Sequence, residues 1–375
     1  MNILILSWRG PGHPNAGGAE QVTLEHAKGW IRGGHTVTLF TSMYQGANEG
    51  EIIEGVKIVR NGDQFFGVKF AAFYWYIFGN HPKFDLVMDE FHGIPFFTPL
   101  YVRVKKLAFI HEVAREVWKL NILPKPINLI PAILGPLIEP LVFKLFYKDI
   151  QFMTVSKSTK VELIKVVINE KKITVINNGV NLFLPKNSIT KEKIKTAVYL
   201  GAISRDKGTE DAIRVFSEIT KMDESWQFWV IGKGSDEFIR DLKKMCLDLG
   251  ISKKVKFWGF VSDAKKFELL DRAHILINPS VLEGWGLVNI EANASRVPVV
   301  GYDVSGMCDS IKNGETGYLC KFGDYKCLAK KAVDLMNDPI RYKKIQTNAY
   351  NWSKQFTWPK SVKQSLDFIE KEIVT

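Results

Sequence analysis

Short apolar runs rich in β-branched residues alternate with longer amphipathic segments along the whole chain, and this alternation limits its fold more than any other feature. Residues 2–7 and 35–41 are typical of buried strands, whereas residues 19–32 carry apolar side chains at helical spacing. Strands and helices in regular alternation predict an α/β fold built on parallel sheets.

The alternation falls into two series, which predicts two domains. The first series has strands at residues 2–7, 35–41, 56–60, 84–89, 107–111, 151–155 and 173–177, and the second at 197–200, 227–231, 255–258, 274–278 and 297–302. A chain of 375 residues also exceeds the ~250 residues at which single cores stop growing. We expect two doubly wound Rossmann-like domains, at residues 1–182 and 195–350.

The segments outside these two domains have patterns of their own. Residues 181–195 are rich in Lys, Asn and Pro and poor in periodicity, which is typical of a linker. Residues 351–375 have a long helical pattern broken at Pro359, and we expect this helix to cross back to the first domain.

Composition and charge narrow the class of protein. The chain is 46% hydrophobic and 24% charged, as in a folded globular protein. Its net charge of +11 predicts an anionic partner. The lysines are scattered over expected helix surfaces and no run combines aromatic with basic residues, so we expect a nucleotide or an acidic lipid surface and no nucleic acid.

Cysteine spacing and the first residues predict a cytoplasmic protein. Cys246, Cys308, Cys320 and Cys327 form no C-x-x-C pair, which favours reduced thiols over a disulfide framework or a zinc site. The apolar run at residues 2–6 has no basic leader and is far shorter than the core of a signal peptide, so we expect a first strand there.

Residues 121–149 are the most apolar stretch of the chain. We expect no transmembrane helix, because Glu139 and prolines interrupt the run, the prolines being Pro124, Pro126, Pro131, Pro136 and Pro140. Two alternatives stay open. With its flanking basic residues, namely Arg115, Lys119, Lys125, Lys144 and Lys148, the stretch could lie on an anionic membrane surface. It could equally be a packing surface or ordinary core.

Residues 281–292, VLEGWGLVNIEA, place two carboxylates around a Gly-Trp-Gly turn. A strand ends at Ser280 and a helical pattern starts near Gly286, so the turn should lie where ligands bind in α/β sheets, with helix N–H groups facing an anion. Glu283 would face the mouth of that site, and Glu291 would lie about one and a half turns into the helix. Taken alone, such a pair is more often a carboxylate of a surface loop and one on a helix face than a binding site.

The same segment carries a resemblance that covers nearly the whole chain. EGWGLVNIE resembles the E-x7-E motif of retaining glycosyltransferases with the GT-B fold, and it is most similar to glycosyltransferase family 4. PNAGGAEQV resembles that family's N-terminal Gly-Gly turn, GAISRDKGTEDAI its phosphate-binding segment, VIGKGSDEF and FWGFVSD its base pocket, and SGMCDSIKNGETGYL its downstream loop. The resemblance implies a GT-B fold, in which two Rossmann-like domains flank an interdomain cleft.

The resemblance also implies roles for individual residues. Glu291 would bind the ribose hydroxyls of a nucleotide and Glu283 a hydroxyl of the donor sugar, with Gly284, Trp285, Gly286 and Leu287 completing the donor-binding turn. His111 ends a strand where the family's histidine meets the donor sugar, although most such histidines are structural; His92 has a weaker claim, toward the acceptor.

Lys207 has a physical reason for its position. An ammonium beside the helix that opens at Gly208 can neutralise a departing diphosphate. The family usually has an arginine where this chain has Ala202, and Arg205 is the expected replacement, with a solvated Arg-Asp-Lys turn as the alternative.

The remaining donor-binding candidates come from three loops. Gly17 and Gly18 could present amides to a phosphate or an acceptor, or form only a tight turn; the Rossmann fingerprint fails because Asn15 stands where it needs its third glycine. Gly232, Phe260 and Val261 match the family's base pocket, and the last two are equally expected in a core.

These residues predict a metal-independent enzyme without a cofactor. No D-x-D triplet occurs, so the carboxylate clamp for a metal-bound diphosphate is missing. We expect retaining transfer of a hexose from a UDP- or GDP-linked donor to a lipid-linked or cell-envelope glycan, at the cytoplasmic face of a membrane. The rival interpretations are a glycoside hydrolase, a noncatalytic nucleotide-sugar or lipid-binding partner, and an epimerase.

Overall fold

A computed structural model divides the chain into two compact units. Unit 1 comprises Met1–Gly179 together with Trp358–Thr375, and unit 2 comprises Val180–Thr357. The structure describes all residues except 115–117, 119–125, 127, 182–189 and 374–375. Most of the predicted linker, Pro124 and the flanking residues Arg115, Lys119 and Lys125 lie outside the described residues.

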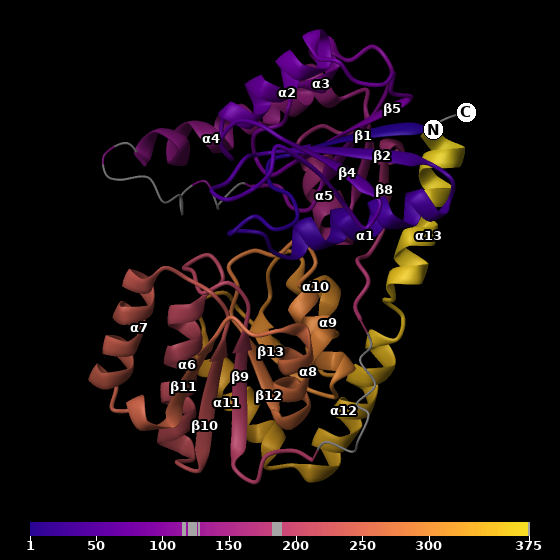
Figure 1. The fold of residues 1–375 in the computed structure, drawn as a ribbon. Coiled ribbons are helices and arrows are strands. Elements are labelled where there is room, and N and C mark those ends of the chain that lie inside the picture. Colours follow the sequence, from indigo (N-terminus) through magenta and orange to yellow (C-terminus); the bar gives the residue numbers. More distant parts are fainter. Residues whose placement is uncertain (115–117, 119–125, 127, 182–189, 374–375) are drawn as a thin grey trace. The chain divides into compact units, whose positions relative to one another are not determined.

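Unit 1 is built on an eight-stranded sheet of order β3-β4-β2-β1-β5-β6-β7-β8, drawn in Figure 1. Its strands are β1 (Asn2–Ser7), β2 (Thr36–Thr41), β3 (Gly50–Ile53), β4 (Val56–Arg60), β5 (Leu86–Phe91), β6 (Lys105–Ile110), β7 (Gln151–Thr154) and β8 (Ile173–Val175). All neighbouring strands pair in parallel except β3 and β4, which are antiparallel.

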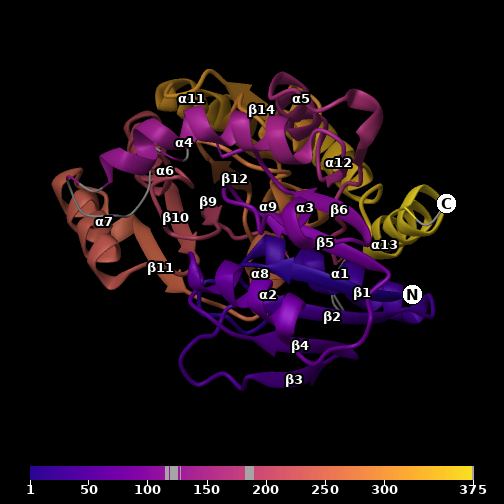
Figure 2. The ribbon, with the colours of Figure 1, turned by 90° about the horizontal axis from the view of Figure 1, so that it is seen from above.

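Helices cover both faces of this sheet. They are α1 (Gly18–Arg32), α2 (Gly67–Phe78), α3 (Thr98–Tyr101), α4 (Leu129–Val142) with a π-helical turn η2 (Phe143–Tyr147), α5 (Lys157–Lys165), and α13 (Trp358–Phe368) with η5 (Ile369–Ile373). Successive side chains of β1 point to opposite faces, so Leu4 and Leu6 pack with Val68 and Ala72 of α2. Helices α2, α3 and α4 lie on this face, as Figures 1 and 2 show, whereas α1 packs on the other face together with α13.

Unit 2 is built on a parallel six-stranded sheet of order β11-β10-β9-β12-β13-β14. Its strands are β9 (Lys195–Leu200), β10 (Trp226–Ile231), β11 (Val255–Gly259), β12 (Ile275–Asn278), β13 (Val299–Tyr302) and β14 (Gly317–Cys320). Its helices are α6 (Thr209–Met222), α7 (Asp236–Asp248), α8 (Asp263–Arg272), α9 (Leu287–Ala294), α10 (Met307–Ser310), α11 (Tyr325–Met336) and α12 (Pro339–Ser353).

The core of unit 2 is split by its sheet into two layers. Ala197 and Tyr199 of β9 pack under α6, α7 and α11, whereas Val198 and Leu200 pack under α8 and α9. This alternation explains why β9 is apolar at every position from Ala197 to Leu200, as expected of a parallel strand covered on both sides. The predicted α/β fold class, with two doubly wound sheets, is confirmed.

Three sequence predictions about local structure are wrong. The helical pattern at residues 351–375 belongs to two helices, because α12 ends at Ser353 and α13 begins at Trp358, with Pro359 in its first turn. Strands β3 and β14 were missed, although β7, β12 and β13, which are equally short, were predicted. The expectation that prolines interrupt residues 121–149 fails for Pro136 and Pro140, which lie inside α4.

Helix α4 continues into η2 without a break, and Leu129–Tyr147 is 19 residues long with a mean hydropathy of 1.8. By length and composition this helix could cross a membrane, and 11% of its most apolar window is buried. Pro136 and Pro140 have no N–H to donate to the carbonyls of Ala132 and Pro136, and both of these residues are half-buried.

The prediction that all four cysteines are reduced thiols is wrong. Cys320 at the end of β14 and Cys327 in the first turn of α11 form a disulfide, with their Cα atoms 6.1 Å apart. The intervening loop brings the two within the range that a disulfide needs, which spacing alone did not reveal. Neither Cys246 nor Cys308 takes part in a disulfide.

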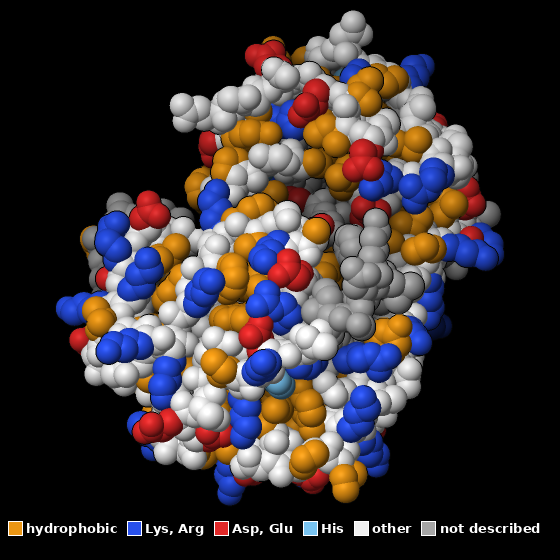
Figure 3. Space-filling view, turned by 60° about the horizontal axis from the view of Figure 1, so that its bottom comes forward, with side chains coloured by type: hydrophobic (Ala, Val, Ile, Leu, Met, Phe, Trp, Pro, Cys, Tyr) orange, Lys and Arg blue, Asp and Glu red, His pale blue; other side chains and the backbone are white. Residues whose placement is uncertain are grey.

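Charged side chains are spread over the molecular surface. Figure 3 shows one face, on which Lys and Arg side chains are interspersed with acidic and uncharged ones instead of forming one continuous basic patch. The excess of positive charge is therefore a general property of this face.

Candidate active site

The candidate site of unit 2 lies where its strand order reverses. Strands β9 and β12 are neighbours in the sheet, and the chain leaves them in opposite directions, toward β10 and toward β13. Ligands of doubly wound sheets bind at the carboxyl ends of such a strand pair. Lys207 follows β9 and Glu283 follows β12, and their Nζ and Oε1 atoms are 3.1 Å apart. The structure therefore brings together two residues that are 76 positions apart in the sequence and were predicted for the same site.

Both helices that start at this point have a glycine as N-cap. Gly208 precedes α6 with φ of 68°, and Gly286 precedes α9 with φ of 72°. Four other helices of unit 2 are capped by side-chain oxygens, those of Ser235, Ser262, Asp324 and Asp338, whereas the short α10 also begins at a glycine, Gly306. A glycine offers no such oxygen, so first-turn N–H groups of α6 and α9 are available to another acceptor, except those of Thr209 and Asn289, which donate to Ser204 O and Gly286 O. The predicted helix starts after Lys207 and near Gly286 are confirmed.

Buried polar side chains fix the start of α9. Asn289 accepts a hydrogen bond from Asn278 Nδ2 of β12 (2.8 Å) and donates one to Ser310 Oγ of α10 (2.9 Å). Both amide side chains also contact Met307 Sδ. The Glu283 carboxylate is itself held from the strand end, because Ser280 Oγ donates to Glu283 Oε1 at 2.7 Å. Ser280 thus positions the Glu283 carboxylate, and the hydrogen bonds among Asn278, Asn289 and Ser310 position the start of α9.

Glu291, the second carboxylate of the motif, lies on the buried side of α9 and contacts a lysine from the preceding helix. Lys266 Nζ of α8 is 2.7 Å from Glu291 Oε1 and 3.0 Å from Asp263 Oδ1. Burial raises the pKa of Glu291, and the Lys266 ammonium opposes that rise. The pKa of Lys266 is raised by its two carboxylate partners although burial acts to lower it. Lys266 and Glu291 therefore form a salt bridge on the mostly buried side of α9.

The loop that carries Lys207 is held by Tyr199. The phenol of Tyr199 donates to Ala202 O (2.6 Å), and Thr209 Oγ1 contacts both Tyr199 Oη (3.0 Å) and Ser204 O (3.1 Å). Burial raises the pKa of Tyr199, so it remains a neutral donor. Arg205, the expected replacement for the missing family arginine, lies outside this network.

The Arg205 side chain contacts residues of α6 and α7. Its Nε is 3.7 Å from Glu210 Oε1, and its guanidinium lies 5.5 Å from the centre of the Phe238 ring. With 69% of its side chain exposed, it matches the solvated-turn alternative in this structure.

The other donor-binding candidates of unit 2 differ in burial. Trp285 is buried against Phe356, its ring centre 4.9 Å away, and its Nε1 has no hydrogen-bond partner among the described residues. Gly284 and Gly286 are buried and Leu287 is half-buried. Val261 packs at the edge of the α8–α9 core layer, but Phe260 is 81% exposed and belongs to no core.

Gly232 closes the loop after β10 against the loop after β9. A Cβ atom at this position would lie 1.7 Å from Gly201 O, so the two backbones approach as only glycine permits. A side chain here would push the two loops apart at the carboxyl edge of the sheet.

In unit 1 the predicted residue His111 directly follows β6 and contacts a carboxylate that sequence reasoning missed. His111 Nε2 is 3.1 Å from Glu90 Oε1, and Thr23 Oγ1 of α1 donates to the same oxygen at 2.5 Å. Glu90 Oε2 is buried with no hydrogen-bond partner among the described residues. The available signal was the pair Asp89-Glu90 within an otherwise apolar strand.

Aromatic rings complete the surroundings of His111. The His92 ring stacks on His111 with centres 5.2 Å apart and planes 6° apart, and Trp8 lies 5.7 Å from His92. The guanidinium of Arg9 lies 4.1 Å from the Trp8 ring centre. Residues at the carboxyl ends of β1, β5 and β6 therefore form one cluster.

The predicted glycine turn starts α1. Gly17 is the N-cap and Gly18 the first residue, and Gly17 N donates to Glu20 Oε2 at 2.6 Å. Arg9 Nε contacts Glu20 Oε1 at 2.8 Å, so Glu20 links this turn to the aromatic cluster. Glu20 already accepts the hydrogen bond of the Gly17 amide, which favours the tight-turn alternative for that group.

Family models match both halves of the chain. "Glycosyltransferase Family 4" matches residues 16–183 and "Glycosyl transferases group 1" matches residues 182–352, so the two adjoin at residues 182–183. The chain belongs to the family 4 type of group 1 glycosyltransferases. The resemblance inferred from EGWGLVNIE and the accompanying motifs is confirmed.

Relatives and solved structures agree with this membership. The capsular polysaccharide biosynthesis glycosyltransferase CapM of Staphylococcus aureus is 31% identical over 225 residues, covering 55% of this chain and 58% of CapM. The chain spans 39–58% of the length of the curated relatives it matches.

Among solved structures, sucrose-phosphate synthase from Thermosynechococcus elongatus superposes with a TM-score of 0.79 at 17% identity, over 99% of this chain and 98% of that one. Anabaena Alr3699/HepE in complex with UDP-glucose gives 0.73 at 17% identity, over 99% of both chains. At these identities the likeness shows the GT-B fold.

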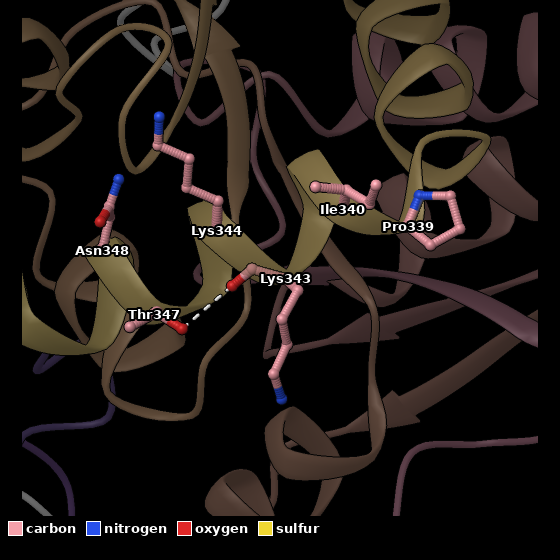
Figure 4. A pocket seen from close by; sticks show the side chains of 6 residues that line it. All are labelled: Pro339, Ile340, Lys343, Lys344, Thr347 and Asn348. Atoms are coloured by element: carbon pink, nitrogen blue, oxygen red, sulfur yellow. Dashed lines mark hydrogen bonds between the residues drawn. The ribbon is translucent and has the colours of Figure 1, made fainter.

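Two further features lie outside the family site. A shallow pocket of about 550 Å³ is lined by residues of α12, Pro339 to Asn348, where Thr347 Oγ1 donates to Lys343 O (Figure 4). All of its lining belongs to one helix surface, so it is unrelated to Lys207 and Glu283.

Within the described residues, no three His, Cys, Asp or Glu side chains are close enough together to hold a metal ion.

Proposed function

We propose that this protein transfers a hexose from a nucleotide-diphosphate donor to a hydroxyl of a lipid-linked or cell-envelope glycan, with retention of anomeric configuration. The observation that carries the proposal is the Lys207–Glu283 pair, 3.1 Å apart at the switch point of a doubly wound sheet and beside two glycine-capped helices. The Lys207 ammonium and the N–H groups at the helix starts can together bind the negative charge of a diphosphate. The neighbouring Glu283 carboxylate can accept a hydrogen bond from a sugar hydroxyl.

Relatives support the substrate classes in this proposal. HepE has been solved with UDP-glucose, which favours a UDP-linked hexose over GDP-linked donors. CapM is named for capsular polysaccharide biosynthesis, which supports an acceptor of the cell envelope.

In the proposed reaction the bond between the sugar anomeric carbon and the diphosphate oxygen breaks, and a bond from the acceptor oxygen to the same carbon forms. The acceptor proton passes to a phosphate oxygen of the departing nucleotide diphosphate. Lys207 and the N–H groups at the start of α9 stabilise the charge that develops on that leaving group. Glu283 orients the sugar through a hydroxyl, and Glu291 binds the ribose.

His111 has the role of a donor-sugar contact in this proposal, and Glu90 orients it. Because Glu90 Oε1 accepts from Thr23 and lies 3.1 Å from His111 Nε2, it fixes the imidazole and leaves Nδ1 as the other polar atom of the ring. Arg205 has no assigned contact with the leaving group, and any part it plays requires a different rotamer.

Titration calorimetry with UDP, GDP and ADP tests the diphosphate site. We expect one nucleotide to bind the intact protein and Lys207→Ala to weaken that affinity by about 10- to 100-fold, the usual loss of one charge-assisted hydrogen bond. Lys221→Ala is the matched control, because Lys221 is an exposed lysine of unit 2 paired with Glu218. Equal affinities for the two variants would contradict the assignment of Lys207.

Product analysis tests the reaction itself. Nucleotide should be released only when an acceptor is present, which separates transfer from hydrolysis, epimerisation and mere binding. Nuclear magnetic resonance of the product should show the donor's anomeric configuration, and an inverted product would refute retention. We further propose that no metal takes part, since the chain has no D-x-D triplet; loss of transfer on adding EDTA, restored by Mg²⁺ or Mn²⁺, would refute this.

A further inference from the structure

Helix α4 exposes a continuous apolar stripe. Residues at four-residue spacing point away from the sheet along its whole length, namely Leu129, Ile133, Leu137, Leu141 and Leu145. A second row, one position further on, is exposed as well and consists of Ile130, Leu134 and Ile138. Soluble helices normally carry polar residues on the solvent side, so this helix has the reverse of the expected pattern.

The inner side of α4 is fixed, so rotation of the helix cannot bury the stripe. Glu139 points inward and accepts hydrogen bonds from Ala114 N (3.0 Å) and Trp118 Nε1 (3.2 Å). Gly135 faces the same Trp118 ring, and Tyr147 of η2 donates to the buried Asp89 at 2.5 Å. The outward direction of the leucines and isoleucines is therefore set by specific contacts on the opposite side.

Helix α2 has a second stripe of the same kind. Its exposed residues follow helical spacing and are Phe66, at the N-cap, Phe70, Phe73, Tyr74, Ile77 and Phe78. Val68 and Ala72 on the other side are buried in the core. Phe70 is 73% exposed, an unusual fraction for phenylalanine.

The two stripes are joined through α3. The Phe73 ring of α2 lies 5.0 Å from that of Tyr101 in α3, and Phe97, the N-cap of α3, lies 5.8 Å from Phe146 of η2. Leu100 of α3 is exposed between them. We call the exposed apolar residues of α2, α3, α4 and η2 the α2–α4 surface; Figure 2 shows these helices on one side of unit 1.

Charge at one end of the α2–α4 surface favours an anionic partner. Helices α2, α3 and η2 each lead into the start of a strand, and exposed basic residues gather along that edge: Lys83, Arg103, Lys105, Lys144 and Lys148. The exposed acids there are already engaged, because Asp85 accepts from Asn2 N and Asp149 contacts Lys172. Glu139 is the only carboxylate within α2 and α4, and it is buried.

We propose that the α2–α4 surface docks unit 1 on the surface of an anionic lipid bilayer. Aromatic and aliphatic side chains enter the boundary between headgroups and acyl chains, and the basic edge contacts anionic headgroups. An interface with another protein normally includes polar groups. The two stripes of the α2–α4 surface have no polar side-chain group except the Tyr74 hydroxyl, which favours a lipid over a protein partner. This docking goes beyond the proposed transfer reaction and does not depend on it.

The helix lies on the bilayer and does not cross it. Although Leu129–Tyr147 is long enough to span, α4 and η2 run between β6 and β7, which are neighbours in one sheet. Spanning would pull Glu139, Phe143 and Tyr147 out of their buried positions in unit 1. Attachment along the side of the helix leaves these contacts intact.

Flotation of the full chain with vesicles tests the proposal. We expect the protein to float with vesicles that contain phosphatidylglycerol and to float much less with pure phosphatidylcholine. The double variant Phe70→Asp/Leu137→Asp changes one exposed residue on each stripe and should lower the partition coefficient at least tenfold. Ile340→Asp is the matched control, because Ile340 is 85% exposed on α12 of unit 2 and should leave binding unchanged.

A second variant separates the electrostatic part. Lys144→Glu/Lys148→Glu should reduce partitioning by roughly fivefold or more per lysine and weaken its dependence on salt. Melting curves without lipid establish that each variant is folded. Sedimentation without lipid tests for a second copy as occupant: a dimer that Phe70→Asp/Leu137→Asp dissociates would overturn the proposal.

Three other results would also overturn it. These are absence of flotation with phosphatidylglycerol vesicles at low salt, equal flotation of the apolar double variant and the Ile340→Asp control, and resistance of the bound protein to extraction by alkaline carbonate, which would indicate a spanning helix. Each readout is lipid binding, so none of them bears on sugar transfer.

Discussion

Gly208 illustrates how single residues shape the candidate site. Its φ of 68° is open to glycine at little cost, and a Cβ atom would lie 1.9 Å from Pro279 O at the end of the strand that leads to Glu283. The residue therefore serves two purposes, since it starts α6 without a side-chain cap and lets the loops after β9 and β12 touch.

Gly208→Ala should destabilise unit 2 by at least about 3 kcal/mol, because the left-handed conformation costs about 1 kcal/mol and the clash adds to it. Gly250→Ala is the control: its φ is 71° but nothing lies within 4 Å of the added Cβ, so it should cost only about 1 kcal/mol. Thermal or urea unfolding of both variants measures the difference. Similar losses would mean that the Pro279 carbonyl moves aside freely.

Residues of the site were predictable from sequence only where one segment carried the chemistry. Glu283, Lys207 and Gly286 lie beside strand ends, so the periodicity of the chain placed them at the edge of the sheet, and the family resemblance indicated the role of Glu283. Lys266 and Asn289 were missed, because their importance comes from partners on other elements, Glu291 and Ser310 respectively. A lone lysine or asparagine in a helical pattern gives no indication of such partners.

At the scale of elements, α1 and α13 form a close helix pair within unit 1. A Cβ atom on Gly29 of α1 would lie 1.9 Å from Val362 Cγ1 of α13. Ser365 Oγ of α13 lies 3.0 Å from Trp30 Nε1 and 2.7 Å from His26 Nδ1, so one hydroxyl serves two buried side chains of α1. The small residues at this contact allow the helices to approach.

Gly29→Ala should therefore destabilise unit 1 by about 1–3 kcal/mol through overpacking, even though alanine is the better helix former. Adding Val362→Ala removes the clashing methyl group and should recover much of that loss, whereas Val362→Ala alone should leave a small cavity and destabilise. A double-mutant cycle followed by urea unfolding measures the coupling. Additive losses would show that Gly29 and Val362 do not meet.

Element boundaries were predicted less well than element types, and α4 shows why. Prolines were taken as breaks because each removes a backbone hydrogen bond. That local cost was outweighed by Glu139, Phe143 and Tyr147, which hold the helix on unit 1 from its inner side. The sequence left open whether the apolar residues of this segment are buried or face a membrane, and only the structure shows which of them face outward.

At the scale of the whole molecule, each unit buries a histidine that resists protonation. Burial lowers the pKa of His26 in unit 1 to about 3, helped by the nearby His111, and lowers that of His274 in unit 2 to about 4, helped by Lys191. The unfolded chain takes up these protons near pH 6.5, whereas the folded units do not until far lower pH. The stability that comes from keeping these two histidines neutral is therefore fully present above pH 6.5, and it is lost as the pH falls from 6.5 toward their folded pKa values.

Each histidine should cost its unit roughly 2 kcal/mol of stability on going from pH 8 to pH 5. His26→Asn should reduce this pH dependence in unit 1 alone, and His274→Asn in unit 2 alone. Hydrogen exchange of α1 and β12 peptides at the two pH values distinguishes the units. If His26→Asn left the slope for α1 unchanged, His26 would have to be protonated or exposed in the native protein.

Unit 1 is formed by two segments that are separated in the sequence, and this affects the order in which the chain can fold during translation. Val180–Thr357 is one uninterrupted stretch, so it can fold as soon as it emerges. Helix α1 emerges much earlier, yet the Ser365 hydroxyl that serves Trp30 and His26 is translated only after all of unit 2. During synthesis one side of α1 therefore stays uncovered until α13 has been translated, which happens only after the whole of unit 2. A chaperone could bind this uncovered side of α1 during that interval.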